Sequence, residues 1–299
     1  MPTQVILPTY SIGSWAANVD DDQGCRWVIS PGGASFVTDG LSRKMHTNER
    51  PFGSGAYRSR SYPAARAGSL QGWCDAGDRV SRIAARKRLM GIFPEGGQAL
   101  LVVDDGIDPQ QITVELDAET PRCSVWADGG GFDWQLPLYA ADGRLLSTVE
   151  RKATADLANG STDGLDWAGG TPGGLDWGNG GLDWGISGAN NVLALQNNGT
   201  ATTWPLLLVT TPSTLTNPAW TDPVTGGVLT YTGSITAGQT LRIDCSPFNP
   251  APVTLDGIDR TGALGSARFI SIPPGSSRAI QFTGVGAGST VAFWRDANN

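Results

Sequence analysis

The chain has 299 residues, which is enough for two domains of ordinary size. It contains 41 Gly, 19 Pro and 11 Trp but only 16% charged residues, and this composition is typical of short strands joined by many turns. The net charge of −7 argues against a dedicated nucleic-acid-binding protein, because such proteins are usually basic.

The sequence does not indicate a metal-binding site or a membrane-spanning segment. Four cysteines, at positions 25, 74, 123 and 245, show no metal-ligand spacing, and His46 is the single histidine. We therefore expect no metal site and mostly buried, free thiols in a reducing compartment. No secretory leader and no apolar run of about 18 residues is visible, so we expect no membrane insertion.

The first part of the chain, residues 1–155, is predicted to be an α+β domain. Its one clear helix runs from Asp78 to Phe93, with Asp75 or Asp78 as the N-cap and with Gly91 and Pro94 ending it. The face expected to be buried comprises Val80, Ile83, Ala84, Leu89, Met90 and Phe93. Alternating or continuous apolar runs predict strands at 5–7, 26–29, 99–103, 112–116 and 132–138.

The segment from Arg43 to Ala67 has few aliphatic residues, and we interpret it as a loop or an extended arm. Between Arg43 and Arg88 the chain carries eleven Lys or Arg against three acidic residues. This basic run is compatible with DNA or scaffold binding, with a solvated surface, or with contacts to acidic residues of a neighbouring subunit. The candidate inter-subunit residues lie on the predicted helix: Arg79, Arg82, Arg86 and Arg88.

Residues 156–190 contain the motif Gly-Leu-Asp-Trp three times, at 164–167, 174–177 and 181–184. The spacings are too short and irregular for a solenoid or a propeller. We interpret the segment as a Gly/Trp-rich linker in which Trp167, Trp177 and Trp184 pack against a neighbouring surface. The alternative is a platform on which these indoles stack against sugar rings.

Residues 191–299 are predicted to form a β-sandwich. Short alternating runs recur between Gly- and Pro-rich breaks, and Asp256-Gly257 between Leu255 and Ile258 is a strong signal for a two-residue hairpin. The fold class expected for the whole chain is therefore mainly β, with an α+β first domain and a C-terminal sandwich.

Catalytic signatures are weak throughout the sequence. His46 has no identifiable acid or nucleophile partner, and neither a Gly-x-Ser-x-Gly elbow nor a phosphate-binding loop occurs. Asp20, Asp21 and Asp22 lack the spacing of an EF-hand loop and fit a surface acidic loop. A glycosidase-type pair of catalytic carboxylates is an alternative that the 28 acidic residues leave open. We nevertheless expect no enzymatic activity and no cofactor.

The order of these features resembles the distal tail proteins of long-tailed siphophages, which are often called minor tail proteins in phages of actinobacteria. The resemblance covers roughly 75–299 and is carried by an ordered succession of motifs. These are Phe132-Asp133-Trp134-Gln135-Leu136-Pro137-Leu138, the three Leu-Asp-Trp units, Asn197-Asn198-Gly199, Thr203-Trp204-Pro205, Asn217-Pro218, Ala237-Gly238, Leu255-Asp256-Gly257 and Ile272-Pro273-Pro274-Gly275.

This resemblance implies a structural virion protein of the baseplate hub. Members of the family form a ring, commonly a homohexamer, at the tail tip, and their second domain is a galectin-like β-sandwich. The implied partners are copies of the chain itself, the tail tube protein and tail-tip proteins, with DNA only passing through the channel. The implied location is the virion, after assembly in the host cytoplasm. The alternative function is a carbohydrate-binding virion module that contacts a host-surface glycan.

Overall fold

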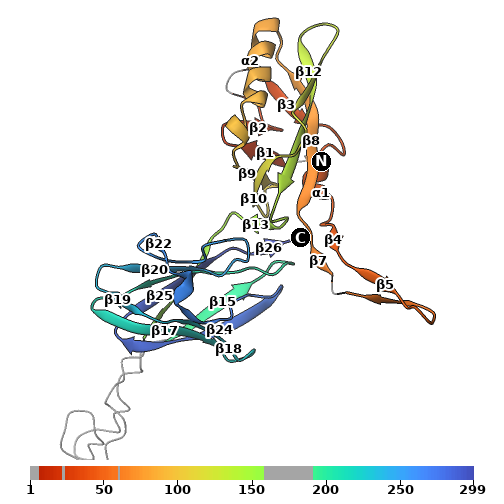
Figure 1. The fold of residues 1–299 in the computed structure, drawn as a ribbon. Helices are drawn as coiled ribbons and strands as arrows, with labels where there is room; N and C mark the ends of the chain where they lie inside the picture. The colour runs from red at the N-terminus through yellow and green to blue at the C-terminus, as the bar shows by residue number, and fades with distance from the viewer. Residues whose placement is uncertain (1–6, 22–23, 60, 158–190) are drawn as a thin grey trace, which may run out of the picture. The chain divides into compact units, whose positions relative to one another are not determined.

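The chain folds into two compact units, which Figure 1 shows in a computed structural model that describes residues 7–21, 24–59, 61–157 and 191–299. Unit 1 comprises Met1–Thr148 together with Ala297–Asn299, and unit 2 comprises Val149–Asp296. The chain therefore passes between the units twice, once after Thr148 and again after Asp296. Strands dominate both units, and the prediction of a mainly β fold is confirmed.

Unit 1 is built on one extended antiparallel sheet with one long helix, α2 (Arg79–Met90). The strands of this sheet are β1 (Thr9–Ile12), β2 (Trp15–Ala17), β3 (Arg26–Ile29), β8 (Arg66–Asp75), β9 (Ala99–Asp104), β10 (Gln110–Leu116), β11 (Arg122–Val125), β12 (Gly131–Ala140), β13 (Leu145–Ser147) and β26 (Ala297–Asn298). A short helix, α1 (Ser35–Thr38), and a 3₁₀ turn at Pro94–Gly96 complete the unit, apart from an arm that is described below.

The longest strands of unit 1, β8 and β12, pair along their whole length, from Gly131 opposite Asp75 to Ala140 opposite Arg66. Alternate residues of both strands point into the core, because side chains in a strand alternate between its two faces. At one end of this core the rings of Trp15, Trp27 and Trp134 meet edge to face, with centroids 5.4–6.0 Å apart. This geometry suits the quadrupoles of aromatic rings, and it packs the β1–β2 hairpin, through Trp15, against Trp27 of β3 and Trp134 of β12.

The long helix α2 begins as the sequence indicates. The side chain of Asp78 accepts hydrogen bonds from the hydroxyl of Ser81 and from the backbone amides of Ser81 and Val80, and these bonds lower the pKa of the Asp78 carboxyl. The predicted buried face is wrong for most of its residues, because the helix turns Ala85 and Leu89 into the core and leaves Val80, Ile83 and Met90 exposed.

A buried arginine holds the start of β8 in place. The guanidinium of Arg66 donates to the carbonyl of Gly143 at 2.8 Å and to those of Phe36 and Asp39 at 3.0 and 2.9 Å. The last two carbonyls belong to α1 and its C-cap, so the side chain takes the place of a helix C-cap. Burial lowers the pKa of Arg66 below its usual value.

Replacing Arg66 with Met is expected to destabilise unit 1 by about 2–4 kcal/mol, because two buried carbonyls and one part-buried carbonyl would lose their charged donor. Urea unfolding followed by tryptophan fluorescence measures this change. The exposed Arg43 is the matched control, and its replacement with Met should change stability by less than about 0.5 kcal/mol. Equal effects of the two substitutions would contradict this assignment.

Unit 2 is a sandwich of two antiparallel sheets, as expected. One sheet contains β14 (Arg151–Asp156), β25 (Ser289–Trp294), β16 (Leu206–Thr210), β20 (Thr240–Asp244), β21 (Val253–Leu255) and β22 (Ile258–Asp259), in that order. The other contains β15 (Val192–Asn197), β24 (Ser276–Gly286), β17 (Thr214–Asp222), β18 (Gly227–Tyr231) and β23 (Leu264–Ala267), and β19 (Ser234–Thr236) pairs with β17. A 3₁₀ turn at Thr261–Ala263 precedes β23.

The core of unit 2 lies between its sheets. Trp220 of β17 stacks on Phe282 of β24, and its indole nitrogen donates across the core to the hydroxyl of Thr290 on β25 at 3.3 Å. The hairpin predicted at Asp256-Gly257 is confirmed: Leu255 pairs with Ile258, and both turn residues have positive φ, at 49° and 81°. A type I′ turn requires such angles at both central positions, and Asp-Gly supplies them at low cost.

The unit boundaries differ from the predicted 1–155, 156–190 and 191–299. Strand β14 pairs with β25 over six residue pairs, which places Arg151–Asp156 in the sandwich. At the other end, Ala297 and Asn298 pair with Leu146 and Leu145, and Ala297 is fully buried in unit 1. Both pairings join residues far apart in the sequence, which local patterns do not encode. Of the predicted linker 156–190, residues 158–190 lie outside the described residues.

The four cysteines are free, and Cys123 is the one that is only half-buried. Burial raises the pKa of Cys74 and of Cys245 to about 12, whereas an unfolded thiol ionises near 9.0. The folded state therefore prefers the protonated thiol, and this contribution to stability is complete below pH 9 and declines as the pH rises toward 12.

We expect the urea midpoint to fall between pH 8 and pH 10.5, and to fall less in a variant that combines Cys74→Ala with Cys245→Ala. Comparing the two slopes separates the thiols from lysine and tyrosine titration. In the native protein iodoacetamide should modify Cys123 first, because the thiolate must be accessible to react. Equal slopes in both proteins would overturn the pH prediction.

Candidate interaction surface

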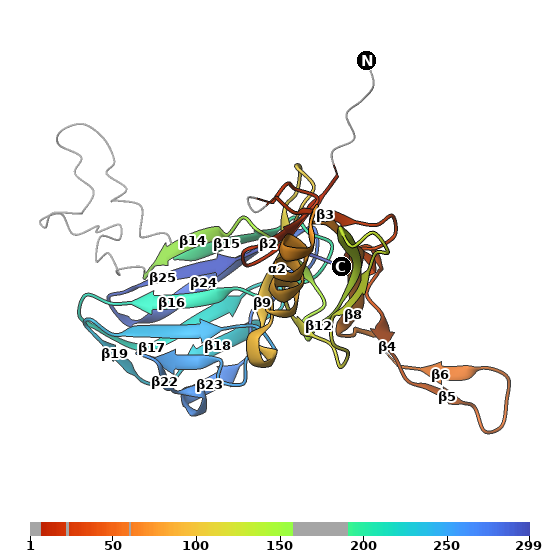
Figure 2. The ribbon, with the colours of Figure 1, turned by 90° about the horizontal axis from the view of Figure 1, so that it is seen from above.

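An arm projects from unit 1 and is the feature of the fold most suited to binding another molecule. It consists of two short antiparallel ribbons in series, which Figure 1 and Figure 2 show extending away from the sheet of unit 1. The first joins β4 (Arg43–Lys44) to β7 (Tyr62–Pro63), and the second joins β5 (Thr47–Glu49) to β6 (Ala56–Arg58). Between the ribbons, His46 and Ser59 exchange hydrogen bonds at 2.8 Å. The sequence predicted a loop or an arm here, but not its strands.

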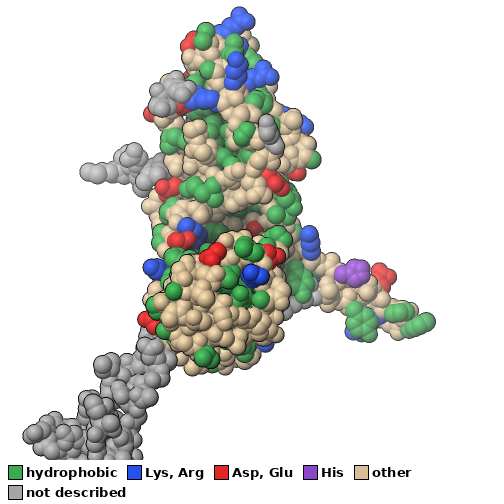
Figure 3. Space-filling view, turned by 60° about the vertical axis from the view of Figure 1, so that its left-hand side comes forward, with side chains coloured by type: hydrophobic (Ala, Val, Ile, Leu, Met, Phe, Trp, Pro, Cys, Tyr) green, Lys and Arg blue, Asp and Glu red, His purple; other side chains and the backbone are tan. Residues whose placement is uncertain are grey.

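Every described residue of the arm between Ser42 and Ser59 is exposed. Phe52, in the loop between β5 and β6, is as exposed as in an extended chain, at 102%, and Tyr57 and Tyr62 are exposed by 64% and 60%. Arg50 lies over the ring of Tyr57, with its guanidinium carbon 4.9 Å from the ring centroid. Figure 3 shows hydrophobic side chains gathered along this arm beside the single histidine.

The arm has no hydrophobic core of its own. A two-stranded ribbon is marginally stable in water, and large exposed apolar side chains mark interaction sites. The described arm carries four Lys or Arg against one Glu. These properties suit a protein partner that offers an apolar pocket in an acidic surface.

A second exposed surface is the outer face of α2. Val80, Ile83 and Met90 are spaced so that they form one stripe along the helix, and Val80 is 78% exposed. Arg79 and Arg86 are exposed on the same helix. Figure 3 shows Lys and Arg side chains gathered at this end of unit 1 among hydrophobic ones. Such a mixture of apolar and arginine side chains is common at protein interfaces.

The four candidate arginines therefore fall into two pairs. Arg82 donates to the carbonyl of Gly129 at 2.6 Å, and Arg88 forms an ion pair with Asp21 at 2.5 Å, so both make contacts within unit 1. Arg79 and Arg86 are exposed and stay candidates for contact with a neighbouring subunit. Asp21 is thus part of an internal pair, and among the described residues no cluster of three potential ligands could hold a metal ion.

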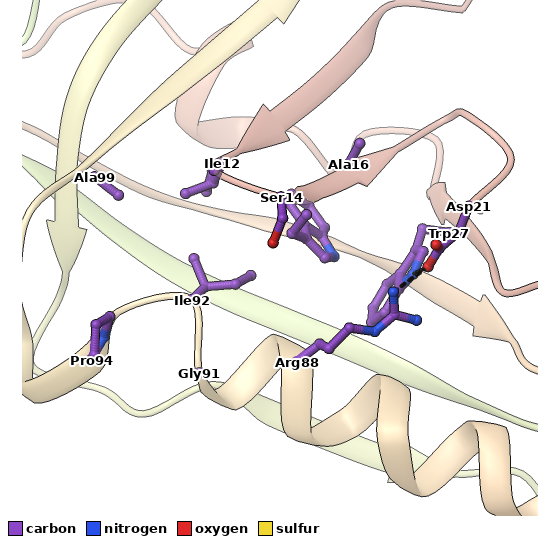
Figure 4. Close-up of a pocket in the computed structure, with 12 residues that line it drawn as sticks. Ile12, Ser14, Ala16, Asp21, Trp27, Arg88, Gly91, Ile92, Pro94 and Ala99 are labelled. Atoms are coloured by element: carbon purple, nitrogen blue, oxygen red, sulfur yellow. Dashed lines mark hydrogen bonds and ion pairs between the residues drawn. The ribbon is translucent and has the colours of Figure 1, made fainter. Parts of the chain in front are cut away.

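A pocket with a volume of about 440 Å³ lies between the β1–β2 hairpin and the C-terminal end of α2. Its deepest side chains are apolar and belong to Ile12, Trp15 and Trp27. Figure 4 shows Ile92 and Pro94 on the helix side of the pocket and the Asp21–Arg88 pair at one end. Asp21 also accepts a hydrogen bond from the indole nitrogen of Trp27 at 3.3 Å, which fixes the ring that forms one wall.

Sequence reasoning missed both this pocket and Phe52. The pocket is formed by segments that come together only in the folded sheet, so no local sequence motif predicts it. The signal for Phe52 was its position as the one phenylalanine of a polar stretch, directly after Pro51. The predicted stacking residues Trp167, Trp177 and Trp184 lie outside the described residues. In the part of the chain that is described, no helix is long and apolar enough to cross a membrane.

Comparison with known proteins gives a result for the fold alone. No family model and no curated protein sequence matches the chain. Among solved structures, the Dit protein of phage SPP1 superposes with a TM-score of 0.63 at 11% identity, covering 97% of this chain and 99% of that one. The chain has the Dit fold. The SPP1 protein is described as a paradigm of the hub adsorption apparatus in phages that infect Gram-positive bacteria.

A second solved structure, the baseplate of phage P2 in its activated conformation with Ca, contains a chain of the same fold. It superposes with a TM-score of 0.50 at 11% identity, covering 96% of this chain and 98% of that one. Because nearly the full length of each chain is covered, the likeness to the Dit fold includes both units and the two passages between them.

Proposed function

We propose that this chain is a structural protein of a phage tail, located at the distal end as part of the baseplate hub. The observation that carries this proposal is the match of both units, over 97% of the chain, to a phage hub protein. The ordered motifs in residues 75–299 support it independently. We propose no catalytic role, because the exposed features of unit 1 are suited to binding.

In its finer form the proposal is a ring of about six copies that joins the tail tube protein to the tail-tip proteins and leaves a channel for DNA. The arm and the outer face of α2 are different surfaces, and a head-to-tail contact between two different surfaces closes into a ring when the rotation allows. Because the arm is basic, Arg79 and Arg86 would contact acidic residues of the next subunit that lie outside its arm. The ordered motifs favour a minor tail protein of an actinobacterial phage.

Light scattering coupled to size-exclusion chromatography tests the ring directly on the purified full chain. The expected mass is that of about six copies of the 31.3 kDa chain. At about 100 μM even weakly associating proteins form a measurable fraction of complex. A mass of one copy at concentrations up to this value would therefore contradict the ring.

The alternative proposal is a galectin-like sandwich that binds a host-surface glycan with the help of the Trp repeats. It is favoured by one observation, the threefold occurrence of Gly-Leu-Asp-Trp. A variant with Trp167, Trp177 and Trp184 changed to Ala separates the two functions. Loss of binding to host cells with an unchanged oligomer would support glycan binding, and unchanged binding to cells would exclude it.

A further inference from the structure

We propose that Phe52, at the tip of one subunit's arm, inserts into the pocket between the β1–β2 hairpin and the end of α2 on a second copy of this chain. The inference rests on the ring proposed above and names the contact that would close it. The pocket residues that matter most are Ile12, Trp15, Trp27 and Pro94.

The tip of the arm has the properties of an interface anchor. Phe52 buries nothing against its own subunit, and the loop that carries it is held by the hydrogen bond between the amide of Arg50 and the carbonyl of Gly55 at 3.2 Å. Gly55 has a φ of +96°, which lets the chain reverse tightly behind the phenyl ring. The phenyl side chain has few rotatable bonds and therefore loses little side-chain conformational entropy when it is buried.

The pocket, which we call the socket, has properties that match this anchor. Its volume of about 440 Å³ exceeds that of one phenyl side chain, and its floor is made of buried aromatic and aliphatic groups. The indoles of Trp15 and Trp27 already meet edge to face, with centroids 5.9 Å apart, so an added ring could continue the same packing. At the charged end, Asp21 and Arg88 neutralise each other and leave no unpaired charge to bury.

The two features lie on opposite sides of unit 1. In Figure 1 and in Figure 2, α2 and the β1–β2 hairpin lie on one side of the β8–β12 pair, and the arm leaves from the other side. Ten extended residues, from Arg43 to Phe52, span roughly 30 Å, which is about the diameter of a small domain. An arm of this length leaving one side of a subunit can therefore reach the socket on the next subunit of a head-to-tail ring.

Charge favours a second copy over other partners. The arm is basic, whereas the chain as a whole carries −7, so the rest of the molecule is acidic. By net charge a second copy therefore attracts the arm, and at the socket itself Arg88 is neutralised by Asp21, although the other Lys and Arg residues of α2 lie on the same helix. A socket for a small molecule or for another virion protein would not require an exposed aromatic on the same chain.

Complementation between two variants tests this contact. Phe52→Ala removes the insert and leaves the socket intact, and Ser14→Trp, at an exposed position on the rim of the pocket, fills the socket and leaves the insert intact. Each variant alone is expected to raise the dissociation constant for self-association by roughly 30-fold or more. Mixed in equal amounts, they have one intact insert and one intact socket, and should form a one-to-one dimer that cannot grow into a ring.

The control is Ile107→Ala, which removes a highly exposed aliphatic side chain outside the arm and should leave the assembly unchanged. Pro94→Trp fills the socket from the helix side and should reproduce the effect of Ser14→Trp; circular dichroism checks that each variant is folded. If folded Phe52→Ala still assembles like the wild type, or if the mixture stays monomeric, the contact is excluded while the ring itself stands. A monomeric wild type would instead overturn the ring and this contact together.

Discussion

Replacing Thr47–Arg58 with Asn-Gly is expected to convert the assembly into a folded monomer. His46 and Ser59 pair by hydrogen bonds, and a two-residue Asn-Gly turn closes a hairpin between such a pair. All twelve deleted residues are exposed, so the core of unit 1 loses nothing and its unfolding transition should stay within about 0.5 kcal/mol of the wild type.

The loss of assembly should be larger than that caused by Phe52→Ala, because the shortened arm also loses Arg50, Tyr57 and Arg58. We expect self-association to weaken by more than about 1,000-fold, measured by light scattering across a dilution series. Ile107→Ala serves again as the control. A shortened chain that assembles at the wild-type concentration would show that the arm has no part in the ring.

Replacing Trp27 with Ala is expected to destabilise unit 1 by about 3–5 kcal/mol. The side chain is 1% exposed, packs edge to face against Trp15, Phe132 and Trp134, and donates to Asp21. Its removal would leave a large cavity at the junction of the β1–β2 hairpin, β3 and β12, which are rigid and cannot collapse into it.

Chemical denaturation followed by fluorescence measures this loss. Trp126 is the matched control, because it is only half-buried at the β11–β12 hairpin, and its replacement with Ala should cost less than half as much. Comparable losses from both substitutions would contradict the view that the tryptophan cluster is a main source of stability in the unit 1 core.

Local sequence patterns predicted those elements whose cause is local. The start of α2 follows from the capping side chain of Asp78, and the hairpin at Asp256-Gly257 follows from the two positive φ angles that those residues accept. The alternation at 112–116 and 132–138 predicted β10 and β12, because one face of each strand meets the core.

Features that depend on distant pairing were not predictable in this way. The return of Ala297 to unit 1 and the placement of Arg151–Asp156 in the sandwich are set by partners more than a hundred residues away. The face of α2 was misjudged for a different reason. Its exposed apolar residues, such as Val80, follow the spacing expected of a buried helix face but are not buried. Exposed apolar residues of this kind are expected where the helix surface forms an interface with another molecule.

The match with the Dit fold covers 97% of the chain and so extends the likeness to residues before 75, which the motif resemblance does not cover. Arg66 shows why that region is hard to recognise from sequence. It is a buried arginine whose partners are backbone carbonyls. Because every residue has a backbone carbonyl, the residue types of the partners do not indicate the contact. The arm is similar, since an exposed ribbon carries no hydrophobic alternation.

Electron microscopy of intact phage particles, with this chain labelled by gold-conjugated antibody, would decide whether it is a protein of the tail tip. We expect label at the distal end of the tail and, in averaged views of that end, a ring of about six copies around the channel. Particles that carry no label, or carry it only on the capsid, would contradict the proposed function.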